Sequence, residues 1–124
     1  MKHVRTVCAI LLAIPMLVFG GNYFLKLFAL PEGDGSAGAE LLQSMRDGGL
    51  MAVIAASHVL VGVLLLPPRT RFFAGVMQLP MSIGIVSFHA TMLPAGLGVA
   101  IAMLVLNLGV ISSDRLKSLM FGSA

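Results

Sequence analysis

Charged side chains are scarce in this sequence. Only 10% of its 124 residues are Asp, Glu, Lys or Arg, whereas 58% are hydrophobic. A soluble domain typically carries roughly 25% charged residues, which keep its surface compatible with water. A chain with so few would expose mostly apolar side chains, so lipid is the expected surrounding. No G-x-S-x-G, phosphate-loop or H-E-x-x-H motif is present either, and we expect no catalytic activity of the chain on its own.

Tryptophan is absent, and cysteine occurs once, at Cys8. A lone cysteine can form neither an intramolecular disulfide nor a cysteine-based metal site, so no metal is expected. The net charge of +3 is a small basic excess, and the basic residues do not cluster on one face. Nucleic-acid binding needs many basic side chains in contact with phosphates. Because this chain has no such basic face, we expect no nucleic-acid partner.

Long apolar runs are what the chain has instead. A bilayer core of about 30 Å needs roughly 20 apolar residues in a helix. Four runs approach this length, over residues 7–30, 50–66, 72–93 and 94–111. Pro67-Pro68 ends the second run, and Pro94 suits the first turn of the fourth helix. The sequence therefore predicts a single membrane domain over residues 1–124, with the fold of an all-α transmembrane four-helix bundle.

A polar segment, residues 31–49, separates the first two runs. It opens with turn residues, Pro31 to Gly35. Within Ala39–Arg46, apolar residues recur at helical spacing before Gly48-Gly49 interrupts the pattern. The segment therefore predicts an outer loop that contains a short interfacial amphipathic helix.

The basic residues indicate the orientation of the bundle. They precede the first run, separate the second from the third, and follow the fourth: Lys2, Arg5, Arg69, Arg71, Arg115 and Lys117. Segment 31–49 is acidic instead. The positive-inside rule places both termini in the cytoplasm, and the expected location is the cytoplasmic (inner) membrane of a bacterium. No small-x-small cleavage site follows the first run, so we expect a retained helix rather than a signal peptide.

Polar residues within the runs are candidates for a site, because polar groups in lipid usually face the bundle interior. Gln78, Ser82 and His89 share one face of the third helix, since they lie at i, i+4 and i+11. The first and second helices add further polar side chains. The sequence predicts one outward-facing, ligand-binding polar pocket made by Asn22, Lys26, His58, Gln78, Ser82 and His89. Two alternatives to ligand binding stay open. The histidines can have a structural role, and the Lys26 side chain can extend to the lipid headgroups.

Several segments, taken in order, resemble the DoxX-like family of small four-helix membrane proteins. Phe19-Gly20-Gly21-Asn22 resembles the family's F-G-x-N pattern, and the segment from His58 to Leu66 resembles E-x-x-x-G-L-L-L-L. Three further segments follow in family order: Phe88-His89, Pro94-Ala95-Gly96 and Leu106-Asn107-Leu108. At two positions the chain departs from the pattern, with Tyr23 where the family often has Lys and His58 where it commonly has Glu.

This resemblance implies a membrane location and a fold more than a reaction. Some members resemble subunits of thiosulfate:quinone oxidoreductases, and others are linked to redox homeostasis complexes. The main functional hypothesis is a small accessory subunit that docks in, or stabilises, a larger membrane redox or energy-converting complex. Its partners would be other membrane subunits and lipid.

Three alternatives are open. A DoxX-like, quinone-linked oxidoreductase subunit would use the polar pocket to bind a quinone, or a lipid-like ligand, and would receive electrons from a partner. A small-molecule carrier is less well supported, because the chain shows no internal repeat. Haem is disfavoured as a cofactor, because the depths of His58 and His89 differ by roughly 7–9 Å along the membrane normal.

Overall fold

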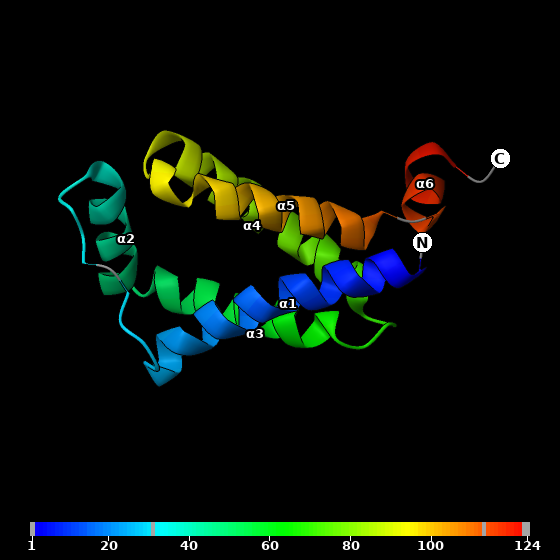
Figure 1. Ribbon diagram of the computed structural model, residues 1–124, viewed down its shortest axis with the longest axis horizontal. Helices are drawn as coiled ribbons and strands as arrows, with labels where there is room; N and C mark the ends of the chain where they lie inside the picture. The colour runs from blue at the N-terminus through cyan, green and yellow to red at the C-terminus, as the bar shows by residue number, and fades with distance from the viewer. Residues whose placement is uncertain (1, 31, 113, 123–124) are drawn as a thin grey trace.

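The computed structural model describes residues 2–30, 32–112 and 114–122. Figure 1 shows a chain built from helices, and no strand occurs in these ranges. The elements are α1 (Lys2–Leu25), α2 (Ala37–Asp47), α3 (Leu50–Leu65), α4 (Arg71–Thr91), the 3-10 turn η1 (Pro94–Gly96), α5 (Leu97–Ile111) and α6 (Asp114–Phe121). The predicted all-α class is confirmed.

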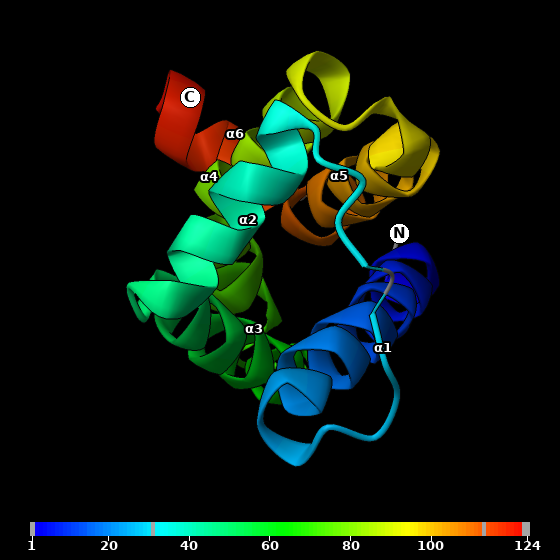
Figure 2. The same cartoon turned by 90° about the vertical axis from the view of Figure 1, so that its left-hand side faces the viewer.

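Helices α1, α3, α4 and α5 form a bundle. Both α1 and α4 pack against α3 and α5, so the four helices close into a ring. Figure 2 shows this ring from the end where α2 lies. Glycines allow α1 and α3 to approach closely, because a Cβ atom at Gly20 would meet the Ala55 carbonyl and one at Gly62 would meet Leu17.

The apolar core draws on all four bundle helices. Its buried members are Ala9, Leu12, Ala13, Met16, Val61, Leu65, Ala74, Met103 and Val110. The alanines let the backbones approach, and the larger side chains fill the remaining space. Four polar residues are buried as well, namely Asn22, Gln78, Ser82 and Asn107. The interior therefore contains amides and a hydroxyl that need hydrogen-bond partners.

The outside of the bundle is apolar on each of its helices. Exposed large hydrophobic residues include Val7, Ile14, Val53, Val63, Phe73, Ile83, Val99 and Val105. Soluble proteins rarely expose apolar patches of this extent. Three segments, α1, α4 and residues 94–111, are long and apolar enough to cross a membrane, and α2 with α3 adds a fourth if the bent pair counts as one span. Among the described residues, helices of membrane-spanning length and hydropathy are therefore confirmed for three of the four predicted spans, because α3 by itself has only 16 residues.

Helix α1 ends earlier than the predicted span 7–30. The Asn22 amide binds the backbone of Phe28 twice, because Nδ2 donates to its carbonyl at 3.0 Å and Oδ1 accepts from its N–H at 2.9 Å. Lys26 adopts a left-handed conformation with φ 50°, and its N–H donates to the Asn22 carbonyl at 2.8 Å. This is a left-handed C-cap, which turns the chain out of the helix although apolar residues follow.

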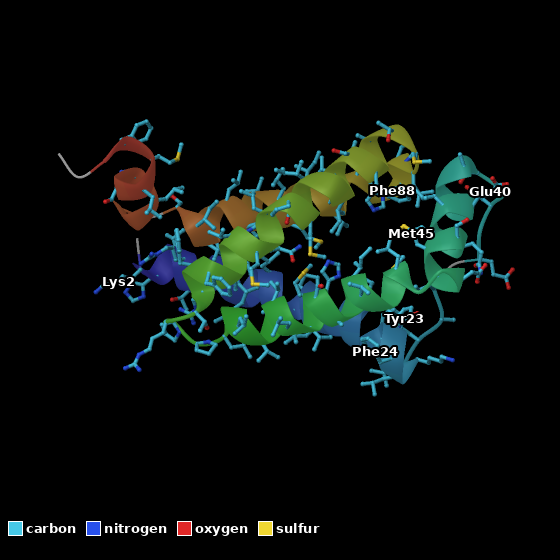
Figure 3. The ribbon with its side chains drawn as sticks, turned by 180° about the vertical axis from the view of Figure 1, so that it is seen from behind. Lys2, Tyr23, Phe24, Glu40, Met45 and Phe88 are labelled. Carbon is cyan, nitrogen blue, oxygen red and sulfur yellow. The ribbon has the colours of Figure 1, made fainter. Side chains whose placement is uncertain are left out.

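Helix α2 confirms the short helix expected in segment 31–49. Ser36 caps its N-terminus, where Oγ accepts from the Ala39 N–H at 3.3 Å. The helix meets α3 at 85°, so it lies across the end of the bundle. Figure 3 shows Met45 on the side of α2 toward the bundle and Glu40 on the side away from it. This amphipathic arrangement agrees with the predicted pattern.

Helix α3 ends because Pro67-Pro68 has no N–H to donate. The last carbonyls of the helix therefore lose their i+4 donors. Thr70 replaces one of them, since its Oγ1 donates to the Leu64 carbonyl at 2.6 Å.

Arg71 replaces two further donors at this helix end. Its Nε donates to the Leu65 carbonyl at 2.9 Å, and its Nη2 donates to the Leu66 carbonyl at 2.8 Å. Nη1 donates to Thr6 Oγ1 at 2.9 Å, which connects α1 to the α3–α4 turn. Arg71 thus binds three elements of the fold together at one end of the bundle.

The two ends of the bundle differ in charge. The N-terminus, the α3–α4 turn and α6 lie at one end, and α2 lies at the other (Figure 1). The first end includes Lys2, Arg69 and Arg71, and the second includes Glu40 and Asp47. Helix α6, which exposes Leu119, Met120 and Phe121, was not among the predicted helices.

We predict that Arg71→Gln lowers the free energy of unfolding by about 2 kcal/mol, because charge-assisted bonds to the α3 carbonyls and Thr6 are lost. Thermal unfolding of the purified protein in detergent measures the change. Arg69→Gln is the matched control, because Arg69 is an exposed arginine two positions away. Equal unfolding temperatures for the two variants would show that the Arg71 bonds do not hold this end together.

Candidate functional site

A chain of buried polar side chains connects α4 to α5. Asn107 Nδ2 donates to the Gly75 carbonyl at 2.8 Å, and Ser82 Oγ donates to Asn107 Oδ1 at 2.9 Å. Gln78 Nε2 donates to Ser82 Oγ across a longer 3.4 Å. Asn107 and Gln78 are fully buried, and Ser82 is 1% exposed. We call Gln78, Ser82 and Asn107 the polar chain.

The polar chain has one open end. Gln78 Oε1 is buried and has no hydrogen-bond partner among the residues that the structure describes. The same is true of His58 Nε2 on α3. Buried polar atoms of this kind are uncommon in native proteins and need an explanation.

His89 has a role in the turn that follows α4. Its Nδ1 lies 2.8 Å from the Leu93 carbonyl. Because a carbonyl can only accept, Nδ1 carries the proton and donates. A Cβ atom at Gly96 would overlap the imidazole ring, so this glycine leaves the space that the ring occupies. The Phe88 ring packs edge-on against His89, with the centroids 5.2 Å apart.

The six residues predicted to share one pocket lie in four different environments. Gln78 and Ser82 belong to the polar chain, which also includes Asn107, a residue outside the predicted set. His58 is the residue on α3 with the unpartnered Nε2. The Asn22 amide is used by the α1 C-cap, where Lys26 is exposed, and His89 is bound to its own turn.

A shallow pocket of about 540 Å³ lies at the α2 end of the bundle. Its walls come from the loop before α2, from α2 itself, and from Leu93 and Ala95. Three acidic residues, Glu32, Asp34 and Glu40, line it together with one basic residue, Arg46. Hydrogen bonds from Ser36 lower the pKa of Asp34 below its ordinary value of 3.8. None of the six predicted residues lines this pocket.

No group of three or more His, Cys, Asp or Glu side chains that could hold a metal ion occurs within the described ranges. The polar chain, being neutral, offers hydrogen bonds rather than charges. From its fold and its buried polar residues, this is a helical protein with three to four apolar helices of membrane-spanning length. The polar groups in its interior are neutral.

Comparison with known proteins adds no relative. The chain matches no protein-family model, no curated protein and no solved structure. The resemblance to the DoxX-like family therefore stays a prediction from the sequence.

We predict that Gly96→Ala lowers the free energy of unfolding by about 1–3 kcal/mol, because the new methyl group would displace the His89 ring from the Leu93 carbonyl. Gly98→Ala is the control, since a Cβ atom there would meet nothing within 4 Å. Thermal unfolding gives the stabilities, and the ¹⁵N chemical shift of His89 Nδ1 reports the hydrogen bond. An unchanged shift in Gly96→Ala would refute the proposed role of the glycine.

Proposed function

We propose that this protein is a small integral membrane subunit that docks laterally against a larger membrane protein and stabilises it. One observation carries the proposal, namely a row of small or short residues on the outside of α4. Pro80, Gly84, Ser87 and Thr91 are all exposed, and they recur at i, i+4, i+7 and i+11. This spacing places them on one side of the helix. We call them the α4 small-residue face.

The α4 small-residue face suits contact with another helix better than contact with lipid alone. Association of helices in membranes favours small residues, which let two backbones approach. A Cβ atom at Gly84 would meet nothing within 4 Å, so the space above this glycine is open to a partner. The two hydroxyls bind back to their own helix, because Ser87 donates to the Ile83 carbonyl at 2.9 Å and Thr91 to the Ser87 carbonyl at 2.8 Å. They therefore bring little desolvation cost to an apolar contact.

Pro80 adds a second reason for a partner on this face. A proline within a helix cannot donate to the carbonyl four residues before it, which is that of Val76. Both residues are exposed. Irregular backbone at membrane depth is tolerated where it is covered by protein. A neighbouring helix on this side of α4 would shield the carbonyl from lipid.

The distribution of charge supports an orientation for the docked subunit. Basic residues gather at the end of the bundle where the N-terminus and the α3–α4 turn lie, and acidic residues gather at the α2 end (Figure 3 labels Lys2 and Glu40 at these opposite ends). The positive-inside rule then favours termini in the cytoplasm and α2 outside, in the inner membrane of a bacterium. The resemblance to the DoxX-like family favours a redox or energy-converting host complex.

The proposal predicts that Gly84→Leu loses the partner while the bundle stays folded. A Cβ atom at this position meets nothing within 4 Å, so leucine adds bulk to the outer side of α4. Native membranes would be solubilised in a mild detergent, and the polypeptides recovered with each tagged variant would be identified and quantified. We expect at least a tenfold loss of the recovered partner, which corresponds to about 1.4 kcal/mol of binding free energy.

Gly98→Leu on α5 is the matched control. Gly98 is equally exposed, and a Cβ atom there also meets nothing within 4 Å. This variant should retain the partner. Recovery of wild-type protein without any stoichiometric partner would refute the docking function. Retention of the partner by both variants would instead show that the contact lies on another face.

A further inference from the structure

The bundle interior contains two polar atoms whose hydrogen bonds the described chain does not satisfy, His58 Nε2 on α3 and Gln78 Oε1 on α4. We infer that a neutral, hydroxyl-bearing ligand binds between His58 and Gln78, donating a hydrogen bond to Gln78 Oε1 and forming a second one with His58 Nε2. This site faces the inside of the bundle and does not depend on the docking function of the α4 small-residue face.

The two atoms belong to the same level of the bundle. Helices α3 and α4 are antiparallel neighbours, and the bond from Arg71 Nε to the Leu65 carbonyl fixes their register at the turn. His58 precedes Leu65 by as many residues as Gln78 follows Arg71. At 1.5 Å per residue, each lies roughly 10 Å from that fixed point along its own helix. The side chains therefore reach similar depths.

The Gln78 side chain and the His58 Nε2 atom are both buried. Gln78 is fully buried, so its amide has no access to the outside of the bundle. His58 lies against α1, because a Cβ atom at Gly20 would be 3.0 Å from the His58 Cβ. Its Nε2 is buried although part of the residue is exposed. A ligand that bridges them would thus lie within the ring of helices.

The polar chain determines what the ligand must offer to Gln78. Asn107 donates to the Gly75 carbonyl, Ser82 donates to Asn107, and the Gln78 amide nitrogen donates to Ser82. Each hydrogen bond in the polar chain is donated in the direction from Gln78 to Gly75. The atom left without a partner in the described chain is therefore Gln78 Oε1, which is an acceptor. The ligand must therefore supply a donor, which excludes groups that only accept, such as ketones and ethers.

A hydroxyl group also matches His58. Neutral imidazole has one donating and one accepting nitrogen, and a hydroxyl can pair with either because it both donates and accepts. The buried polar residues of the bundle are all neutral amides or hydroxyls. A charged ligand would lack a compensating charge among them and would be expensive to bury. The ligand is therefore neutral, and its hydroxyl can belong to water or to an amphiphile such as a phenol or a lipid alcohol.

A double-mutant cycle on the full-length protein in detergent tests the site. The variants are His58→Phe, Gln78→Leu and the double replacement, with thermal and chemical unfolding as the readout. If one ligand contacts both residues, either single replacement already removes it, and the second replacement costs less. We therefore expect the folded-to-unfolded ratio of the double variant to be at least fivefold higher than the ratio predicted by adding the two single effects. Gln78→Leu also removes the Gln78–Ser82 bond. This loss occurs in the wild-type background and in the His58→Phe background alike, so it cancels in the coupling energy. Gln43→Leu combined with His58→Phe is the control, because Gln43 is exposed on α2 and should be additive with His58.

Two measurements on the wild-type protein identify the source of the hydroxyl. Mass spectrometry of an organic extract detects a stoichiometric amphiphile, which should be absent from His58→Phe if it binds here. Magnetisation transfer from water to the imidazole of His58, with a ¹⁵N shift typical of a hydrogen-bonded Nε2, identifies water instead. Either result supports the site. An additive cycle, a shift typical of an unbonded Nε2, or a bound molecule without a hydroxyl would each overturn it.

Discussion

Backbone carbonyls at the helix ends set the main constraint on this fold. A helix leaves its last carbonyls without intrahelical donors, and an apolar environment would supply no water in their place. Polar side chains supply the missing donors here. Arg71 binds the end of α3, the Asn22 amide binds the chain that leaves α1, and His89 binds the turn after α4. The ends of α1, α3 and α4 are therefore fixed by nearby side chains, and the bundle can be apolar elsewhere.

This constraint explains which parts of the fold could be predicted from the sequence. The helical class, the short α2 and the end of α3 at Pro67-Pro68 follow from composition, periodicity and the missing proline donors. The end of α1 does not, because hydropathy averages over the apolar residues beyond Leu25. The Asn22 side chain ends the helix through a bond to a residue six positions further on, and averaging cannot detect such a bond. Averaging also hid α6, which is only 8 residues long.

The candidate site shows the corresponding limit for polar residues. Helical spacing correctly placed Gln78 and Ser82 on one face of α4, because that geometry is local. Contact between helices depends on their register and crossing, which a single sequence does not determine. The sequence therefore missed that Asn107 completes the polar chain. It also grouped His89 with ligand-binding residues, although the imidazole already donates to its own turn.

The polar atoms with bonds inside the chain hold the fold, and those without bonds are available for binding. Among the buried polar atoms of the described residues, His58 Nε2 and Gln78 Oε1 have no such bond, and they make up the proposed interior site. Helix α4 has two separate surfaces. Gln78 faces inward, where the polar chain ties α4 to α5, while Gly84 faces outward. Helix α3 is tied to α4 by side-chain bonds at the Arg71 end. Because the polar chain joins α4 to α5, a displacement of the far end of α4 would carry α5 with it and change the separation between Gln78 and His58.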